Sequence, residues 1–378
     1  MTPRLVLAGL GHSHLFVFEA AILGKLPPCE LVVCTGEPHH VYSGMVPGWL
    51  GGRYAREEVY LPVGPLVEAA GATWRQAHAT GLDLSTRSLT LADGTTERYD
   101  LCSVAVGSVA AGLDIPGARE HAIPLKPLAN IERIVERLQE LAGSGGGSVV
   151  VVGGGVAGVE IAFGVAARLR LLDPRHPVEI RIVSRDATPA ADRGTGVIRR
   201  VATSLKRAGI TFMARTEVTA VEPGLVRTAP GQSLKADLII WATGPAAPEW
   251  LADTGLTTDQ RGYLLVDDHL RSLGHTDILA AGDCATLDRH RGTDKAGVYA
   301  VRMGPQLLAT IGHTLGDDPL PEPYTPQRHW LALLNTGDGR AIASRNGITL
   351  EGAWAMRWKD RIDRAFMGRF RGVVSRES

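Results

Sequence analysis

Two glycine-rich turns, each set between an apolar strand and an apolar helix, constrain the fold of this chain more than any other feature. The more regular one is GGGVAG at residues 153–158, which follows the four valines 149–152. In this G-x-G-x-x-G pattern the glycines permit a tight turn, and the helix N-terminus then offers its N–H groups to a pyrophosphate. We predict that this turn binds a dinucleotide through Gly153, Gly155, Val156, Ala157 and Gly158.

A second copy of this design begins 144 residues earlier, at the start of the chain. A strand over residues 4–8 leads into Gly9-Leu10-Gly11, followed by a helix over 15–23 and a strand over 30–35. His14 stands where a third glycine is usual, so we expect the helix to pack slightly farther from its strand. We interpret His12, Ser13 and His14 as turn residues and expect no metal site, because no cysteine or carboxylate accompanies them. Two such units predict an α/β fold with two Rossmann-like dinucleotide-binding domains.

The composition disfavours several other classes of protein. The 40 Lys and Arg residues balance 40 Asp and Glu residues, so no overall field attracts nucleic acid. Hydrophobic residues make up 44% and charged residues 21%, which is typical of a globular protein. The four cysteines form no C-x-x-C pair and the first apolar run is too short for a signal peptide. We therefore expect a cytoplasmic protein with reduced thiols.

The pair Gly282-Asp283 follows a predicted strand at 277–281. A carboxylate here can accept hydrogen bonds from polyol hydroxyls, and the helix that follows would point its N-terminus at a flavin. Asp283 alone could equally be a helix cap, but after two dinucleotide turns it favours a flavoprotein. Neither nucleotide strand ends in the acid that usually binds an adenosine ribose. Glu37 is the candidate for the first site, and Arg185 fits the 2′-phosphate of NADPH at the second.

The order of these motifs resembles that of the two-dinucleotide-binding-domain flavoproteins, the pyridine nucleotide-disulfide oxidoreductase superfamily. The similarity extends over most of residues 1–300 and includes segments 99–101, 105–108, 115–117 and 242–244. Within the superfamily, the chain looks like the branch of type II NADH dehydrogenases and sulfide:quinone oxidoreductases. Residues 11–14 and 42–48 also look like the flavoprotein module that some bacteria fuse to selenide, water dikinase, although this sequence holds no kinase portion.

The resemblance implies a domain organisation and a set of cofactor contacts. Residues 1–118 and 245–325 would form an FAD-binding domain, residues 119–244 an inserted NAD(P)H-binding domain, and residues 326–378 a C-terminal region. The glycine-rich link 143–148 is the best candidate for a crossing between the domains. The second turn, Arg185 and Gly244 are assigned to NADH or NADPH. The implied FAD contacts are Gly9, Gly11, His12, Ser13, His14, Glu37, Tyr42, Ser43, Gly107, Ser108, Gly282 and Asp283.

The cysteines restrict the chemistry that this resemblance allows. Disulfide reductases of the superfamily carry a redox cysteine pair where this chain has residues 42–48, which contain no cysteine. The resemblance then implies hydride transfer from NAD(P)H to the flavin and on to a small acceptor, most simply a quinone. Glu160, Lys126 and Tyr299 are the candidate catalytic residues. Their structural alternatives are a solvated helix residue, a surface lysine and a core aromatic, respectively.

Two rival functions stay open at this stage: a flavoprotein reductase of selenium metabolism, and a non-catalytic FAD-binding sensor or assembly protein. The sequence after Trp330 has little periodicity until residue 354. There an aromatic and aliphatic set recurs every four residues and predicts an amphipathic helix with one apolar face and a net charge of +4 over 357–371. This face suits a peripheral contact on the cytoplasmic side of a membrane, a helix closing the flavin domain, or a homodimer interface. The set is Trp354, Trp358, Ile362, Phe366 and Phe370.

Overall fold

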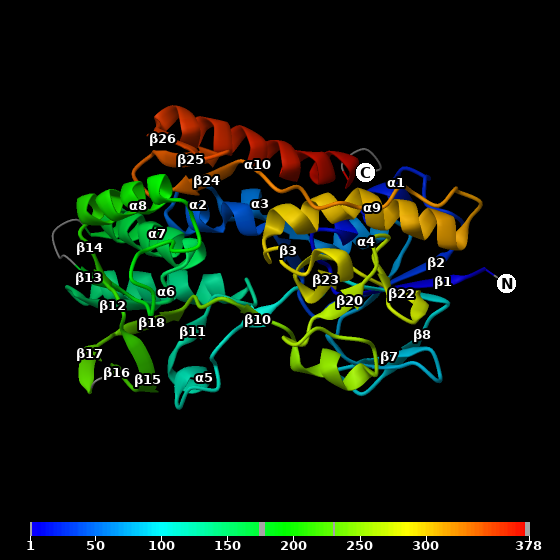
Figure 1. Cartoon of the computed structure of the whole chain (residues 1–378), viewed down its shortest axis with the longest axis horizontal. Coiled ribbons are helices and arrows are strands. Elements are labelled where there is room, and N and C mark those ends of the chain that lie inside the picture. Colours follow the sequence, from blue (N-terminus) through cyan, green and yellow to red (C-terminus); the bar gives the residue numbers. More distant parts are fainter. Residues whose placement is uncertain (1, 174–177, 230, 375–378) are drawn as a thin grey trace.

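Two mainly parallel sheets, lying side by side, form the body of the molecule, and a long C-terminal helix runs across the top of both (Figure 1). The computed structural model describes residues 2–173, 178–229 and 231–374. The second sheet is built from residues that lie between strands of the first in the sequence. The predicted α/β architecture with two Rossmann-like units is thereby confirmed.

The first sheet has eight strands in the order β23-β20-β21-β22-β9-β1-β2-β5. Strand β1 lies between β2 and β9 and is parallel to both. The three strands are buried and almost wholly apolar, as expected where a parallel sheet is covered on both faces. The strand bounds are β1 (Arg4–Ala8), β2 (Glu30–Cys34), β5 (Thr73–Arg75), β9 (Leu101–Val104), β20 (Leu264–Val266), β21 (Arg271–Ser272), β22 (His275–Ala280) and β23 (Ala285–Leu287).

Helices and small sheets cover both faces of this sheet (Figure 1). Helices α1 (His14–Ile22) and α9 (Gly297–Leu315) pack against each other on one face, and a three-stranded sheet lies on the other. That small sheet comprises β6 (Ala79–Asp83), β7 (Ser88–Leu91) and β8 (Thr96–Arg98). The segment between β2 and β5 contains β3 (His39–Val41), η1 (Ser43–Met45), α2 (Val46–Leu50), α3 (Arg56–Val59), β4 (Tyr60–Pro62) and α4 (Val63–Ala69).

The second sheet is all parallel, with five strands in the order β11-β18-β12-β13-β14. Its central strand β12 begins at Gly147 and ends with the four valines 149–152, which are buried. Its strands are β11 (Ile123–Pro124), β12 (Gly147–Val152), β13 (Val178–Val183), β14 (Ile210–Met213) and β18 (Leu238–Trp241). The helices are α5 (Ala118–His121), α6 (Asn130–Gly143), α7 (Val156–Leu172) and α8 (Thr195–Ala208), and an antiparallel sheet is formed by β15 (Glu217–Glu222), β16 (Leu225–Ala229) and β17 (Gln232–Lys235).

The chain passes between the two sheets at β10 (Val109–Ala110) and β19 (Pro245–Ala246), which pair antiparallel with each other. The link 143–148 was predicted as the crossing, and that prediction is wrong. This link joins α6 to β12 within the second unit, and Gly145, Gly146 and Gly147 have φ values of +81°, +132° and +155°. Glycine adopts such positive φ values without strain, so the glycine-rich composition reflects the backbone turn into β12.

The C-terminal region contains a sheet that the sequence did not reveal. Strands β24 (Ala332–Asn335), β25 (Ala341–Arg345) and β26 (Ile348–Gly352) form two antiparallel pairs and pack between α7, α8 and the final helix α10 (Ala353–Val374). The strands are short and do not alternate strictly between apolar and polar residues, so no hydrophobic periodicity indicates them in the sequence. Residues 375–378 of the predicted C-terminal region lie outside the described residues. No helix among the described residues is long and apolar enough to cross a membrane.

Helix α10 does not present one continuous apolar face, so the predicted single stripe is wrong. Trp354, Trp358 and Ile362 are 41%, 43% and 42% exposed, whereas Phe370 is 1% exposed. A four-residue step drifts by about 40° around a helix, so the whole set turns through about 160°. The first three side chains therefore face solvent, while Phe370 packs against Phe16 of α1.

Candidate functional site

The first turn is closely packed against the end of β9. Gly9 has φ +80°, and a Cβ on Gly11 would lie 2.5 Å from the carbonyl oxygen of Ala105. The His14 ring takes the place of the third glycine: its Nδ1–H donates to Gly9 O at 2.7 Å, and its Nε2 accepts from Ser103 Oγ at 2.9 Å. Burial lowers the pKa of His14 to about 4, which is consistent with this neutral tautomer. The turn thus retains its form without a third glycine.

The second turn leaves space at the start of α7. Gly153 has φ +122° and, if it carried a Cβ, would clash with Ala242 O at 2.3 Å, while a Cβ on Gly158 would clash with Gly153 O at 2.0 Å. At Gly155, in contrast, no atom lies within 4 Å of a Cβ, and this residue caps α7 without any side-chain hydrogen bond. Open space beside uncapped helix N–H groups fits a dinucleotide pyrophosphate. Gly244, just after β18, also borders open space.

Asp283 lies in η3 (Gly282–Cys284), immediately after β22, where three segments meet. Its Oδ2 accepts hydrogen bonds from Lys126 Nζ at 2.8 Å and Ser108 Oγ at 2.9 Å. Burial by itself would raise the pKa of Asp283, but Lys126 and Ser108 together lower it. Lys126 is thus a partner of the carboxylate and not an isolated surface lysine. Asp283 Oδ1 makes no hydrogen bond to any described residue, which leaves an acceptor for a polyol hydroxyl.

Ser43 of η1 and the start of α9 converge on His12. The ring Nε2 of His12 is 3.0 Å from Ser43 Oγ, and a Cβ on Gly297 would lie 3.1 Å from the same oxygen. Tyr42 stacks on Phe366 of α10, with ring centroids 4.6 Å apart. Burial, assisted by His40, lowers the pKa of His12 to about 3, so this ring is neutral. Three residues predicted from the sequence, His12, Tyr42 and Ser43, are therefore neighbours in space.

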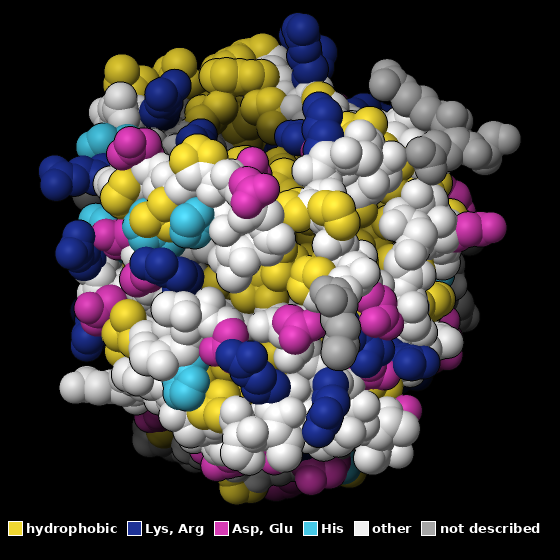
Figure 2. Space-filling model, turned by 90° about the vertical axis from the view of Figure 1, so that its right-hand side faces the viewer, with side chains coloured by type: hydrophobic (Ala, Val, Ile, Leu, Met, Phe, Trp, Pro, Cys, Tyr) yellow, Lys and Arg dark blue, Asp and Glu magenta, His cyan; other side chains and the backbone are white. Residues whose placement is uncertain are grey.

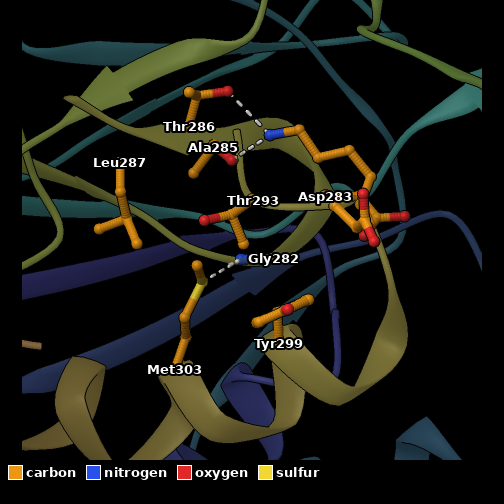
Figure 3. A pocket seen from close by; sticks show the side chains of 10 residues that line it. Gly282, Asp283, Ala285, Thr286, Leu287, Thr293, Tyr299 and Met303 are labelled. Atoms are coloured by element: carbon orange, nitrogen blue, oxygen red, sulfur yellow. Dashed lines mark hydrogen bonds between the residues drawn. The ribbon is translucent and has the colours of Figure 1, made fainter. Parts of the chain in front are cut away.

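A narrow pocket lies beside Asp283 (Figure 3). Tyr299 of α9 and Asp283 border it, and the Gly282 N–H donates to Met303 Sδ at 3.2 Å across its base. The lining residues are Gly282, Asp283, Ala285, Thr286, Leu287, Thr293, Asp294, Lys295, Tyr299 and Met303.

Lys295 is a member of this pocket that sequence reasoning missed. Its Nζ donates to Thr286 Oγ1 at 2.8 Å, contacts Ala285 O and lies 4.1 Å from the centre of the Tyr263 ring. Burial lowers the pKa of Lys295 to about 8. No motif surrounds this lysine, so nothing in the sequence distinguishes it from a surface lysine.

Glu160 of α7 belongs to a buried polar network that includes the C-terminal helix. Its Oε1 accepts the Asn335 N–H at 2.7 Å, and burial raises the pKa of Glu160 to about 7, although Lys359 opposes the shift. Lys359 Nζ donates to Gly44 O at 2.7 Å and to Asp363 Oδ2 at 2.8 Å, and Asp363 also bonds the Tyr42 hydroxyl. Lys359 and Asp363 are 7% and 4% exposed. The sequence did not single out this pair, because charged residues on an amphipathic helix are usually solvated.

The remaining predicted residues lie at the edges of the two nucleotide units. Gly107 follows β9 in open space, with φ +74°. Glu37 is half-buried after β2, with its Oε1 3.8 Å from His78 Nε2. Arg185 is exposed just after β13, beside Asp186, whose backbone N–H and carboxylate both bond the Ser184 hydroxyl.

Two named proteins are similar in sequence to most of this chain. The chain is 29% identical over 291 residues to an NADH dehydrogenase-like protein of Mycobacterium tuberculosis, an alignment that covers 75% of this chain and 72% of the relative. It is 25% identical over 376 residues to demethylphylloquinone reductase of Synechocystis, covering 94% and 89%.

Solved structures share the fold at lower identity. The sulfide:quinone oxidoreductase of Aquifex aeolicus superposes with a TM-score of 0.78 at 17% identity, covering 98% of this chain and 92% of that one. The Plasmodium falciparum NDH2 in complex with NADH superposes with a TM-score of 0.75 at 13% identity, covering 97% and 98%.

The pattern of the family described as pyridine nucleotide-disulphide oxidoreductase matches residues 18–307, which begin after the first nucleotide turn and include the second turn and Asp283. The residues of both turns and Asp283 fit the cofactors of that family. The chain therefore belongs to the pyridine nucleotide-disulphide oxidoreductase family and is an FAD-dependent NAD(P)H oxidoreductase.

Proposed function

We propose that this protein transfers a hydride from NAD(P)H to FAD and then reduces a quinone, without a redox disulfide. The observation that carries the proposal is the chemistry of segment 42–48, where Tyr42 and Ser43 adjoin His12 and no thiol is present. All four cysteines are elsewhere, and burial raises the pKa of Cys34 to about 12 and of Cys284 to about 11. Thiols that stay protonated are poor redox nucleophiles, so a direct route to a small acceptor is favoured.

Separate sets of residues are suited to bind the two cofactors. The first turn, Ser43 and Asp283 would hold FAD, which supplies the hydride-accepting chemistry when bound, and the second turn would hold NAD(P)H. Residues 1–118 and 245–325 are the proposed FAD-binding part, and residues 119–244 the NAD(P)H-binding part. Lys126 orients Asp283 through their ion pair.

Reduction of a quinone to a quinol consumes one proton with each hydride, and Glu160 is suited to hold it. Because Glu160 Oε1 accepts the Asn335 N–H, the proton resides on Oε2. A pKa of about 7 lets the carboxyl be protonated and deprotonated near neutral pH.

The pocket beside Tyr299 is our candidate for the acceptor. The Tyr299 ring borders this pocket and offers an aromatic surface to a quinone ring. Demethylphylloquinone reductase and the type II NADH:quinone oxidoreductase of Staphylococcus epidermidis, which is 21% identical over 333 residues, act on quinones by name and support this choice.

The exposed part of α10 supports a peripheral membrane contact. Figure 2 shows hydrophobic side chains gathered at the top of the molecule, the level at which α10 lies in Figure 1. Ile348 and Leu350 of β26 are 67% and 51% exposed, next in sequence to Trp354 and Trp358. Exposed Arg357 and Arg361 flank these aromatics and would attract anionic lipid on the cytoplasmic face. A second copy of the chain covering this surface is the alternative occupant.

Steady-state assays of the flavin-loaded protein test the proposal. We expect NADH oxidation with menadione and little with selenite or elemental selenium. Turnover only with a selenium species would favour the selenium-metabolism function, to which the resemblance of residues 11–14 and 42–48 points. Flavin-loaded protein without turnover on any acceptor would favour a sensor or assembly role.

The coenzyme preference is a prediction that depends on Arg185. Because Arg185 is exposed beside the second turn and Asp186 is tied to Ser184, we expect NADPH to be used within about tenfold of NADH, about 1.4 kcal/mol of discrimination. Arg185→Ala should lower flavin reduction by NADPH but leave reduction by NADH nearly unchanged. A thousandfold preference of the wild type for NADH would contradict this prediction.

A further inference from the structure

A second pocket, of about 190 Å³, lies where α8 begins, and none of its lining residues is among those assigned to the cofactors. The loop that leads into it contacts the second turn, because the Ala190 N–H donates to Gly154 O at 2.8 Å. Three separate segments border it: residues 192–197, residues 328–332 and residues 344–346, which form the end of β25 and the start of the turn after it. Each contributes one arginine, namely Arg193, Arg328 and Arg345. Because these residues are far apart in the sequence, tertiary packing alone brings their charges to one place.

The charge around this pocket is not balanced within the described part of the chain. Arg328 and Arg345 form no ion pair there, and Arg193 is paired only with Asp192, at 3.1 Å. By contrast, arginines such as Arg4 and Arg207 each contact two carboxylates. Three arginines and one aspartate line the pocket, a formal net charge of +2 that a bound anion would offset.

The pocket also holds one of these arginines in place. The guanidinium of Arg193 lies 4.9 Å from the centre of the Trp330 ring, a cation–π contact that limits its rotamers. Buried Val197 and Ala332 form an apolar floor, and Ser344 and Asn346 add polar groups at the rim. An arginine held in this way loses less freedom on binding an oxyanion.

We propose that this pocket binds a phosphate group, carried by a small soluble anion or by an anionic phospholipid. A guanidinium group can donate two parallel hydrogen bonds to two oxygens of a phosphate. Three guanidinium groups offer more donors than a single carboxylate can accept. A lipid source is compatible with the fold because Arg345 pairs across the β25–β26 hairpin with exposed Ile348. The inference does not depend on the identity of the electron acceptor.

Calorimetric titration of the flavin-loaded protein with inorganic phosphate, at constant ionic strength, tests the site. We expect saturable binding that weakens about tenfold or more in Arg193→Gln and Arg345→Gln. Arg199→Gln, on the exposed side of the same helix α8, is the matched control and should bind as the wild type does. Thermal unfolding of each variant verifies that it is folded.

Vesicles distinguish the two sources of phosphate. If the source is a lipid, Arg345→Gln should also weaken binding to phosphatidylglycerol vesicles but not to phosphatidylcholine vesicles. If the source is soluble, only the inorganic phosphate titration should change. The proposal is overturned if neither phosphate nor phosphatidylglycerol vesicles distinguish the arginine variants from Arg199→Gln. It is also overturned if the variants raise the KM for NADH and NADH abolishes phosphate binding, since the arginines would then serve the dinucleotide.

Discussion

Glu160 shows how much one residue's chemistry depends on its surroundings. On the helix surface it would be an ordinary carboxylate, but burial raises its pKa to about 7, although the hydrogen bond from the Asn335 N–H of β24 opposes the shift. Lys359 opposes this shift from the C-terminal helix, and Arg193 opposes it from the loop before α8, whereas Asp363 adds to it. The proton affinity of Glu160 is thus set by three segments that are distant in sequence.

We predict that Glu160→Gln removes the descending limb of the profile of kcat against pH. If protonated Glu160 supplies the proton, kcat with menadione should fall as the pH rises through about 7 in the wild type and should not do so in the variant. The folded-state pKa lies above the usual 4.5, so ionisation destabilises the folded wild type as the pH rises from 4.5 to 7. The Tm of Glu160→Gln should therefore depend less on pH over that range. An unchanged descending limb would rule out Glu160 as the proton donor.

Asp283 provides a second test at the residue scale. Asp283→Ala removes the partner of Lys126 and Ser108 and the acceptor proposed for the ribityl chain. Buried polar groups left without a hydrogen-bond partner cost about 1–3 kcal/mol, so FAD affinity should fall by about 5- to 150-fold. The measurement is fluorescence of flavin released on heating, which also tests whether FAD is non-covalent. Asp288→Ala, in exposed η4 (Asp288–His290), is the control and should retain FAD.

At the scale of elements, α10 performs two separate structural tasks. One side buries Met356, Met367 and Phe370, and polar contacts to residues 42–60 hold the helix in place. Those contacts include Tyr54 donating to Asp360 Oδ1 at 2.5 Å. The other side exposes the tryptophans near its start. Deleting the helix would therefore unfold part of the core, and point substitutions are the better test of membrane binding.

The two sides of α10 should respond differently to substitution. Trp354→Ser with Trp358→Ser should abolish flotation with anionic liposomes at low salt and shift the Tm little, because both side chains are more than 40% exposed. Phe370→Ala should instead destabilise the fold by about 3–5 kcal/mol, because the ring is buried. Wild-type protein that remains at the bottom of the gradient would exclude the membrane contact. A concentration-dependent dimer lost in the double variant would identify this surface as a homodimer interface.

At the scale of the whole molecule, the segment containing α2 and α3 joins the two sheets. Arg168 of α7 donates from Nε to Leu50 O at 2.8 Å and from Nη2 to Trp49 O at 2.7 Å. Arg56 of α3 pairs with Glu132 of α6 at 2.6 Å. These contacts attach the segment that follows β2 of the first sheet to the helices of the second sheet.

We expect Arg168→Met to loosen this junction. The loss of two hydrogen bonds to buried carbonyls should cost about 1–3 kcal/mol and lower the Tm. Flavin reduction by NADH in stopped-flow experiments should slow because the two sites are less well aligned, whereas FAD content should not change. Arg170→Met is the neighbouring control, because among the described residues the Arg170 side chain donates only to Gly337 O, at 3.3 Å. Equal effects of the two substitutions would show that the junction does not depend on Arg168.

The sequence by itself determined the features that depend on neighbouring residues. Strand β1 lies at the residues predicted, and both glycine turns occur where a side chain would clash with backbone. Such turns depend on local φ values and close backbone contacts, so a short motif is enough to specify them. The order of the motifs also led to the correct family.

Only the tertiary structure decided which distant side chains meet. The Lys126–Asp283 pair joins positions 157 residues apart, and Lys359 reaches Gly44 O across 315 residues. The exposed side of α10, the sheet β24–β26 and the arginine pocket likewise depend on how separate elements pack. Periodicity describes each element alone, whereas burial and charge pairing depend on the partner that covers it.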